Sequence, residues 1–99
     1  MIKYVIRITL LAGIIDEYNK WAKTQERTLS MAGKVKMQAY RIAAGKDDVA
    51  LTFDFGDMEA WASWYGKPDV QKFITGLRRY TSQRSRELWG PSPGFPKLG

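Results

Sequence analysis

The chain has 99 residues, a formal net charge of +6, and a composition that is 44% hydrophobic and 13% aromatic. These values are typical of one globular domain and exclude a disordered chain. Cysteine and histidine are both absent, which excludes disulfides, thiol catalysis, thiolate or imidazole metal sites, and any nucleophile that depends on a histidine base.

The first two expected elements are a strand and a helix. Apolar residues occupy every even position from Ile2 to Leu10, and this alternation predicts a strand covered on one face only. From Ile14 to Ala32 the apolar residues recur at helical spacing instead. Asp16 and Glu17 fall in the first turn, where acidic groups favour the positive end of the helix dipole. Gly33 suits the residue that ends such a helix.

Two further strands are expected, joined by a hairpin. The segment from Val35 to Ala44 is a strand candidate, but its buried face is ambiguous because apolar side chains occur on both sides. Residues 45–48, with the sequence Gly-Lys-Asp-Asp, suit a hairpin connection. From Val49 to Phe55 the alternation is strict and predicts a strand covered on one face. The small and polar residues of its other face are Ala50, Thr52 and Asp54.

A pair of short helices follows the third strand. Asp57 is a favourable N-cap for a helix over Met58 to Tyr65, which Gly66 ends. Pro68 suits the first turn of the next helix, because its missing N–H needs no partner there. The apolar stripe of this next helix consists of Val70, Phe73, Ile74 and Leu77.

The C-terminal part completes the fold. We expect a last strand over about Thr81 to Trp89, although the same residues could also form a helix. Residues 91–99 are rich in proline and glycine and should form an extended arm, since they can continue neither element. The predicted organisation is therefore one domain over residues 1–90, followed by the arm.

The predicted order of elements indicates the fold class. Strand, helix, strand, strand, two helices and strand give an α+β fold with a four-stranded antiparallel sheet and helices on one face, the ferredoxin-like arrangement. A half-covered sheet needs a cover, and the same face of a second copy is the simplest one, so we expect a homodimer. The expected uncovered face shows Val5, Arg7, Thr9, Ala50, Thr52 and Asp54, with Gln38 and Tyr40 beside them.

Four stretches of the sequence add a family resemblance. They are the opening strand running into Gly13, the helix with Tyr18 and Trp21, the segment 53–57 leading into a Trp-bearing helix, and the closing residues 87–91. Through them, nearly the whole chain resembles the dimeric α+β-barrel superfamily, which includes the antibiotic-biosynthesis monooxygenases. The resemblance implies two sheets that face each other in a dimer, and oxygenation without a cofactor.

One branch of that superfamily degrades haem with an Asn on the first strand, a Trp on the helix after the third strand, and a later His. By resemblance, Trp64 corresponds to the Trp. The Asn position falls near Ile6 or Arg7, and the His position near Ile74 or Thr75. Neither Asn nor His is present at these positions, which argues against haem degradation, and we expect no cofactor.

Arg7 and Asp54 are the main candidates for catalysis, because both lie on the uncovered face of two strands expected to be neighbours at the centre of the sheet. They could form an ion pair at the dimer interface. Alternatively, Arg7 would anchor a substrate carboxylate or phenolate, and Asp54 would accept a proton. Tyr40 would supply a hydroxyl to either arrangement, and Thr52 would contact the substrate.

The remaining candidate residues are aromatic. Trp61 and Trp64 lie three residues apart on one short helix. They either pack on the sheet or, with Phe73, form the walls of a pocket for a flat apolar ligand between helix and sheet. The sequence leaves both interpretations open.

A basic C-terminal third raises a different function. The net charge favours anionic partners, and four arginines could contact nucleic-acid phosphates. Ferredoxin-like sheets bind RNA through aromatic side chains on the open face of the third strand, where this chain has Ala50 and Thr52. We therefore expect no specific nucleic-acid binding. The four arginines are Arg78, Arg79, Arg84 and Arg86.

No apolar run reaches the roughly 18 residues of a membrane-spanning helix, so we expect no membrane association and a cytoplasmic location. The functional hypothesis is a cofactor-independent monooxygenase that acts on a small phenol or hydroquinone in a pocket between sheet and helices. The alternative is a homodimeric protein that binds a small aromatic or anionic molecule without turnover, or that has a structural role.

Overall fold

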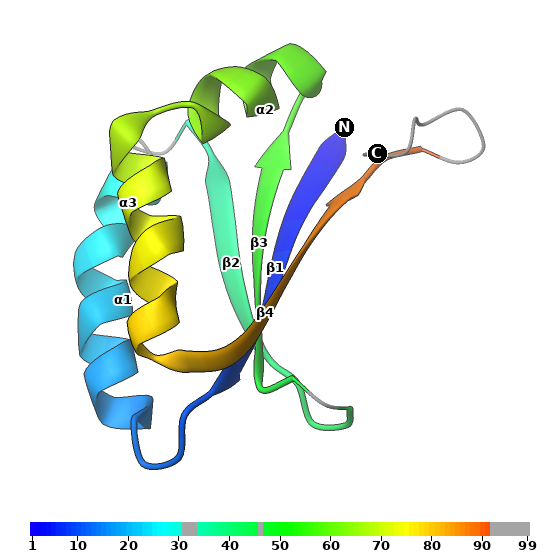
Figure 1. The fold of residues 1–99 in the computed structure, drawn as a ribbon. Coiled ribbons are helices and arrows are strands. Elements are labelled where there is room, and N and C mark those ends of the chain that lie inside the picture. Colours follow the sequence, from blue (N-terminus) through cyan, green and yellow to red (C-terminus); the bar gives the residue numbers. More distant parts are fainter. Residues whose placement is uncertain (31–33, 46, 92–99) are drawn as a thin grey trace.

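The computed structural model describes residues 1–30, 34–45 and 47–91 of the chain. Within them, four strands form one antiparallel sheet in the order β2-β3-β1-β4, and the helices cover one of its faces (Figure 1). This is the expected ferredoxin-like α+β fold, so that prediction is confirmed. In chain order the elements are β1 (Ile2–Leu10), α1 (Ile15–Ser30), β2 (Lys36–Arg41), β3 (Val49–Phe55), α2 (Met58–Tyr65), α3 (Pro68–Gly76), the 3-10 turn η1 (Leu77–Arg79) and β4 (Thr81–Trp89).

The hydrophobic core lies between the sheet and the helices. β1 is antiparallel to both of its neighbours, β3 and β4. Its register places Tyr4 opposite Phe53 and Ile6 opposite Leu51, and all four side chains are buried. They join the buried side chains of the helices in one cluster, so the alternation in the sequence marks the core face of each central strand.

The boundaries of most elements agree with the sequence prediction. β4 is a strand and not a helix, whereas β2 covers only Lys36–Arg41 of the expected segment. The Asp57 carboxylate accepts a backbone hydrogen bond of 2.8 Å in the first turn of α2, which confirms it as the N-cap. The predicted helix end at Gly33, Lys46 of the hairpin, and the arm beyond Pro91 lie outside the described residues. In the part of the chain that is described, no helix has the length and apolar character needed to cross a membrane.

The uncovered face of the sheet is the one that the sequence predicts. In the register of β2 and β3, Tyr40 is opposite Ala50 and Gln38 is opposite Thr52, so these four residues share that face. Met37 lies opposite Phe53 instead and faces the helices, which resolves the ambiguity over β2. The strand β4 contributes Gln83, Ser85, Glu87 and Trp89 to the uncovered face.

The strand β4 contains a bulge near its start. Thr81 is opposite Leu10, whereas Gln83 is opposite Thr9, so Ser82 has no residue of its own opposite it on β1. An extra residue of this kind shifts the alternation of the strand by one position. The β4 side chains that consequently face the helices are Thr81, Arg84, Arg86 and Leu88.

The helices α1 and α3 pack against each other through an aromatic contact. Trp21 of α1 stacks on Phe73 of α3, with ring centroids 5.0 Å apart and planes 2° from parallel. Trp21 also lies against Gly76, where a Cβ atom would stand only 2.7 Å from the indole carbon Cζ2. The missing side chain at Gly76 therefore permits this close approach of the two helices.

Candidate functional site

Among the cavities bordered by the described residues, two adjoin the helix-covered face of the sheet, one toward each edge. The first, which we name the arginine cavity, lies between α3–η1 and the strands β1 and β4 and has a volume of about 420 Å³. This volume falls within the range of small-molecule sites. Its apolar lining is Ile6, Ile74 and Leu77, and its polar lining is Thr75, Arg78, Arg84, Ser85 and Arg86.

The turn η1 and the start of β4 position the arginine side chains. The Thr81 hydroxyl donates a hydrogen bond of 2.7 Å to the Leu77 carbonyl, which ties β4 to η1. The Arg84 guanidinium donates to Thr81 Oγ1 at 3.0 Å and is held beside the cavity. Because alternate residues of a strand share a face, Arg86 lines the cavity from the same strand.

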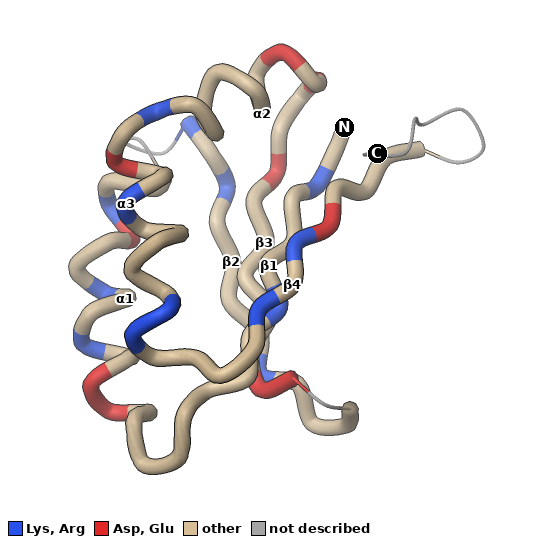
Figure 2. Tube along the Cα trace, viewed as in Figure 1, with Lys and Arg blue, Asp and Glu red and all other residues tan. Residues whose placement is uncertain are grey.

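The arginine cavity is positively charged. Arg84 and Arg86 donate to hydroxyl oxygens, of Thr81 and Tyr65 respectively, and not to carboxylates. The ion pairs among the described residues both lie on the opposite face of the sheet. Figure 2 shows basic segments just after α3, in η1, and along β4, and both segments border the cavity. The charge of this cavity therefore favours an anionic ligand.

An aromatic cluster adjoins the arginine cavity at Arg86. The ring of Tyr4 lies 5.8 Å from that of Trp61 and 5.6 Å from that of Tyr65, and the last two rings stack at 5.1 Å. Tyr4 is only 2% exposed. Burial is the main cause that raises the pKa of Tyr4, and the nearby Tyr65 raises it further, while Arg86 opposes the rise. Tyr4 therefore remains protonated at neutral pH and can act as a hydrogen-bond donor.

Two buried donors of this cluster are poorly satisfied. The Tyr4 hydroxyl and the Trp61 indole N–H make no hydrogen bond of good geometry within the described residues. Buried polar groups are usually satisfied, and here the Tyr4 hydroxyl interacts with Tyr65 and Arg86 without ideal geometry. The described residues contain no group of three or more metal-ligating side chains. Guanidinium, hydroxyl and indole groups suit an anion or a neutral oxygen.

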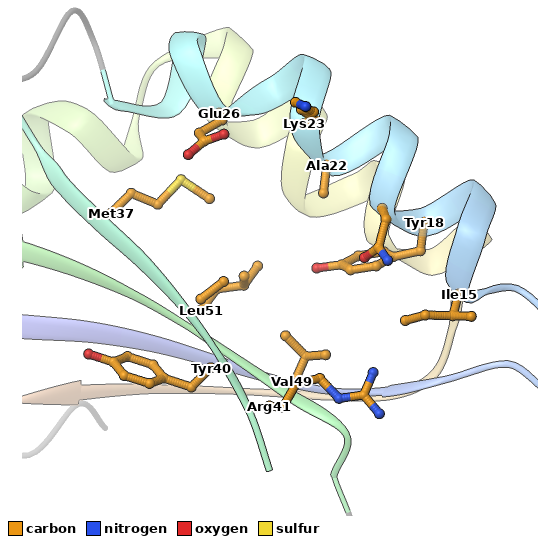
Figure 3. A pocket seen from close by; sticks show the side chains of 12 residues that line it. Ile15, Tyr18, Ala22, Lys23, Glu26, Met37, Tyr40, Arg41, Val49 and Leu51 are labelled. Carbon is orange, nitrogen blue, oxygen red and sulfur yellow. The ribbon is translucent and has the colours of Figure 1, made fainter.

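The second cavity, which we name the α1 cavity, lies between α1 and the strands β2 and β3 (Figure 3). Its volume is about 430 Å³, and side chains such as Met37 and Leu51 make its lining mainly apolar. Tyr18 lines it and is 3% exposed, and burial raises the pKa of Tyr18 to about 12. Tyr40 borders this cavity from β2, but its side chain lies on the uncovered face, where its hydroxyl donates to Gln38 Oε1 at 2.7 Å.

The two residues predicted to anchor the substrate and accept its proton are on the uncovered face, as expected, but they are not paired with each other. Asp54 is opposite Lys3 in the register and forms an ion pair with it at 3.2 Å. Arg7 is opposite Ala50, farther along the same strands, and pairs with Glu87 at 3.0 Å. Each charge is therefore matched by its nearest opposite charge on the sheet.

The predicted substrate-binding residues lie on both sides of the sheet. Thr52 is buried on the uncovered face. Trp64 and Phe73 are 2% and 1% exposed within the core, and the Trp64 indole N–H donates to the Leu29 carbonyl at 2.9 Å. Trp61 belongs to the aromatic cluster beside the arginine cavity. Because the sheet separates Thr52 from the three aromatic residues, the predicted residues do not share one cavity within a single chain.

A smaller cavity does bring two of the predicted residues together. Asp54 and Trp64 both line a space of about 240 Å³ near the end of β3, beside Lys34 and Lys67. Ligand sites usually exceed roughly 300 Å³. This space is therefore a weaker candidate than the arginine cavity and the α1 cavity.

Four residues of this region have no predicted small-molecule role: Tyr4, Tyr65, Arg84 and Arg86. Tyr4 continues the alternating apolar series of β1, so the pattern alone indicates a core residue. Arg84 and Arg86 are two positions apart, which places both on one face of a strand, but on different faces of a helix. That the two arginines share one face becomes apparent only when Thr81–Trp89 is identified as a strand.

Comparison with solved structures identifies several similar folds. The chain is similar to a dabb-family protein with a ferredoxin-like fold from Mesorhizobium loti, with 17% identity over 91% of this chain and 95% of that chain and a TM-score of 0.72. It is also similar to SnoaB, a cofactor-independent oxygenase from Streptomyces nogalater, with 14% identity over 97% of both chains and a TM-score of 0.71. A dimeric ferredoxin-like protein of unknown function from Thermobifida fusca has 14% identity over 91% of this chain and 90% of that chain, with a TM-score of 0.72.

At these identities the likeness establishes the fold, and the expected structural resemblance is confirmed at that level. The neighbours include proteins with an oxygenase activity, a dimeric assembly and no assigned role. No family model and no curated protein sequence matches the chain.

Proposed function

We propose that the protein oxygenates a small phenolic substrate in the arginine cavity without a cofactor. The observation that supports this most strongly is that three arginines, Arg78, Arg84 and Arg86, line one cavity of suitable size whose lining contains no carboxylate. Arg86 also donates to the Tyr65 hydroxyl of the neighbouring aromatic cluster. The similarity to SnoaB is consistent with this class of reaction. The proposed substrate class is a phenol with an activated CH₂ group in its ring system, as in anthrones.

Binding would promote ionisation of the substrate. The guanidinium groups of Arg78, Arg84 and Arg86 line the cavity, and a positive charge close to a phenol lowers the pKa of that phenol. The lining contains no carboxylate, so the substrate proton would leave to solvent. The Tyr65 hydroxyl, which accepts a hydrogen bond from Arg86, would hold that guanidinium beside the substrate.

The ionised substrate would then react with oxygen directly. Its anion transfers one electron to O₂, and the resulting substrate radical and superoxide combine to form a C–O bond at the CH₂ carbon. The peroxide takes up a proton and loses water, which leaves a C=O group. One oxygen atom enters the product and the other leaves as water, so no external reductant is required. The arginines would stabilise the anionic oxygen species by charge.

Oxygen consumption tests this proposal. Purified protein is mixed with anthrone-like substrates, which carry the ring CH₂ group that the proposed step oxidises, in an oxygen-electrode assay. We expect Arg84→Gln to lower kcat/KM by roughly tenfold or more, the effect of losing one charge-assisted hydrogen bond. Arg79→Gln is the matched control because Arg79 does not line the arginine cavity, and it should retain the wild-type rate.

Two further variants distinguish the two faces of the sheet. Arg7→Ala and Asp54→Asn remove the charges initially expected to act in catalysis, which lie on the uncovered face. If these variants lose activity while Arg84→Gln retains it, the reaction takes place between the sheets of a dimer and not in the arginine cavity. If the wild-type protein consumes no oxygen with any such substrate, the oxygenase proposal is dropped in favour of ligand binding without turnover.

We also propose that the protein forms a homodimer through the uncovered face of its sheet. Tyr40 and Trp89 are 48% and 45% exposed on this face, and the guanidinium of Arg7 lies 5.8 Å from the centre of the Trp89 ring. Exposed aromatic side chains of this kind are enriched at protein interfaces. Light scattering should give twice the mass of one chain at micromolar concentration. A monomer under those conditions contradicts this assembly.

A further inference from the structure

The α1 cavity exists because small side chains face it from two elements. Ala22 of α1 and Ala39 of β2 both line the cavity, and neither fills the space between the helix and the edge strand. Met37 and Leu51 provide an apolar surface within it (Figure 3). A cavity of about 430 Å³ with such a surface suits the apolar part of a small molecule.

The two ends of the α1 cavity differ in charge. Arg41 and Ile15 lie toward one end, and Glu26 and Met37 toward the other (Figure 3). The hydroxyl end of Tyr18 points into the space between them. Along α1, the distance from Ile15 to Glu26 is about 16 Å at a rise of 1.5 Å per residue. A molecule that extends along this cavity therefore meets a guanidinium at one end only.

We propose that the α1 cavity binds a monocarboxylic acid with an apolar body. Its carboxylate contacts the Arg41 guanidinium, which forms no ion pair within the described residues. Its apolar body lies over Met37 and Leu51 and is flanked by Tyr18. Lys23, which also lines the cavity, adds a second positive charge, and together the two cations exceed the one carboxylate of the lining.

This site is separate from the one proposed for oxygenation. The α1 cavity and the arginine cavity share no lining residue, and the buried side chains of the central strands lie between them. The inference therefore goes beyond the oxygenase proposal, and each can fail without the other. It adds a second ligand class, a carboxylic acid, at the opposite edge of the sheet.

An NMR titration of the full chain, labelled with ¹⁵N, tests the proposal. Decanoate and 2-naphthylacetate represent an aliphatic and an aromatic acid, and decan-1-ol is the uncharged match to decanoate. We expect at least one acid to bind with saturable shifts confined to residues of α1, β2 and β3, and decan-1-ol to bind roughly tenfold more weakly or not at all. Equal binding of the alcohol, or no saturable binding of either acid, overturns the proposal.

Single substitutions locate the two parts of the ligand. Arg41→Gln should weaken binding of the acid roughly tenfold and leave the affinity for the alcohol unchanged. Ala39→Phe fills the cavity from an exposed strand position, where an aromatic residue is compatible with β-structure, and should abolish binding of both. Lys20→Gln, an exposed residue of α1 outside the lining, and Arg84→Gln should bind as wild type does. An unchanged affinity for the acid in Arg41→Gln rejects the carboxylate contact.

Discussion

Replacing Gly76 with alanine should destabilise the protein by forcing α3 away from α1. A Cβ atom at this position would stand 2.7 Å from Cζ2 and 3.3 Å from Cη2 of Trp21, so the indole or the helix must move by several tenths of an ångström. The indole is constrained on two sides, since its ring centroid lies 5.0 Å from that of Phe73 and 5.0 Å from that of Tyr80. Relief of the clash therefore disturbs the packing of α1 against α3 and η1.

The expected magnitude follows from two opposing contributions. Overpacking of a well-filled core costs about 1–3 kcal/mol, while replacing a helical glycine with alanine stabilises by about 0.5–1 kcal/mol. The net loss for Gly76→Ala is then on the order of 1–2 kcal/mol in the free energy of unfolding. For a domain of this size, that loss lowers the Tm by roughly 5–15 °C.

Thermal and denaturant unfolding, followed by circular dichroism, measure this loss. Gly66→Ala is the matched control, because its φ is −76° and a Cβ atom there meets only the Ala62 carbonyl oxygen, at an ordinary 3.5 Å. It should remain within about 0.5 kcal/mol of wild type. A Gly76→Ala variant as stable as wild type refutes the reasoning. In a Trp21→Leu background the cost of Gly76→Ala should shrink, and an undiminished cost would show that the indole is not the cause.

Three further changes test individual contacts. Asp57→Ala removes the 2.8 Å cap of α2 and should cost about 1 kcal/mol in denaturant unfolding. Trp64→Phe keeps a ring in the core but leaves the buried Leu29 carbonyl without its 2.9 Å donor, and should cost about 1–3 kcal/mol. Between pH 10 and about 12, the folded chain retains the Tyr18 proton that the unfolded chain loses, so stability should fall as the pH rises through this window. Tyr18→Phe should reduce that decline, and a slope equal to wild type would contradict the role of Tyr18.

Most of the fold could be predicted from the sequence, because its patterns are local. The alternation over Val49–Phe55 and the cap at Asp57 each depend on neighbouring residues, and both agree with the structure. The faces of β2 could not be assigned in the same way, since this edge strand carries apolar and polar side chains on both faces. Pairing with β3 decides them.

The candidate site was harder to predict because it depends on register and on distant contacts. The alternation of the two strands places Arg7 and Asp54 on one face, but only the register shows that Glu87 and Lys3 are their ion-pair partners. The link between Arg86 and the hydroxyl of Tyr65 joins residues far apart in the sequence. No periodic pattern signals such a contact.

The bulge at Ser82 determines which charges each face of the sheet presents. Arg86 and Glu87 are adjacent in β4, so one faces the helices and the other faces the open side. If Ser82 were drawn into regular pairing with Thr9, every later residue of β4 would change sides. Glu87 would then enter the cationic cavity, and Arg86 would appear at the proposed dimer face. One unpaired residue thus keeps the charges of the proposed ligand site apart from those of the proposed dimer face. An insertion or deletion in β4 that shifts the alternation of its side chains would change the charges on both faces of the sheet at once.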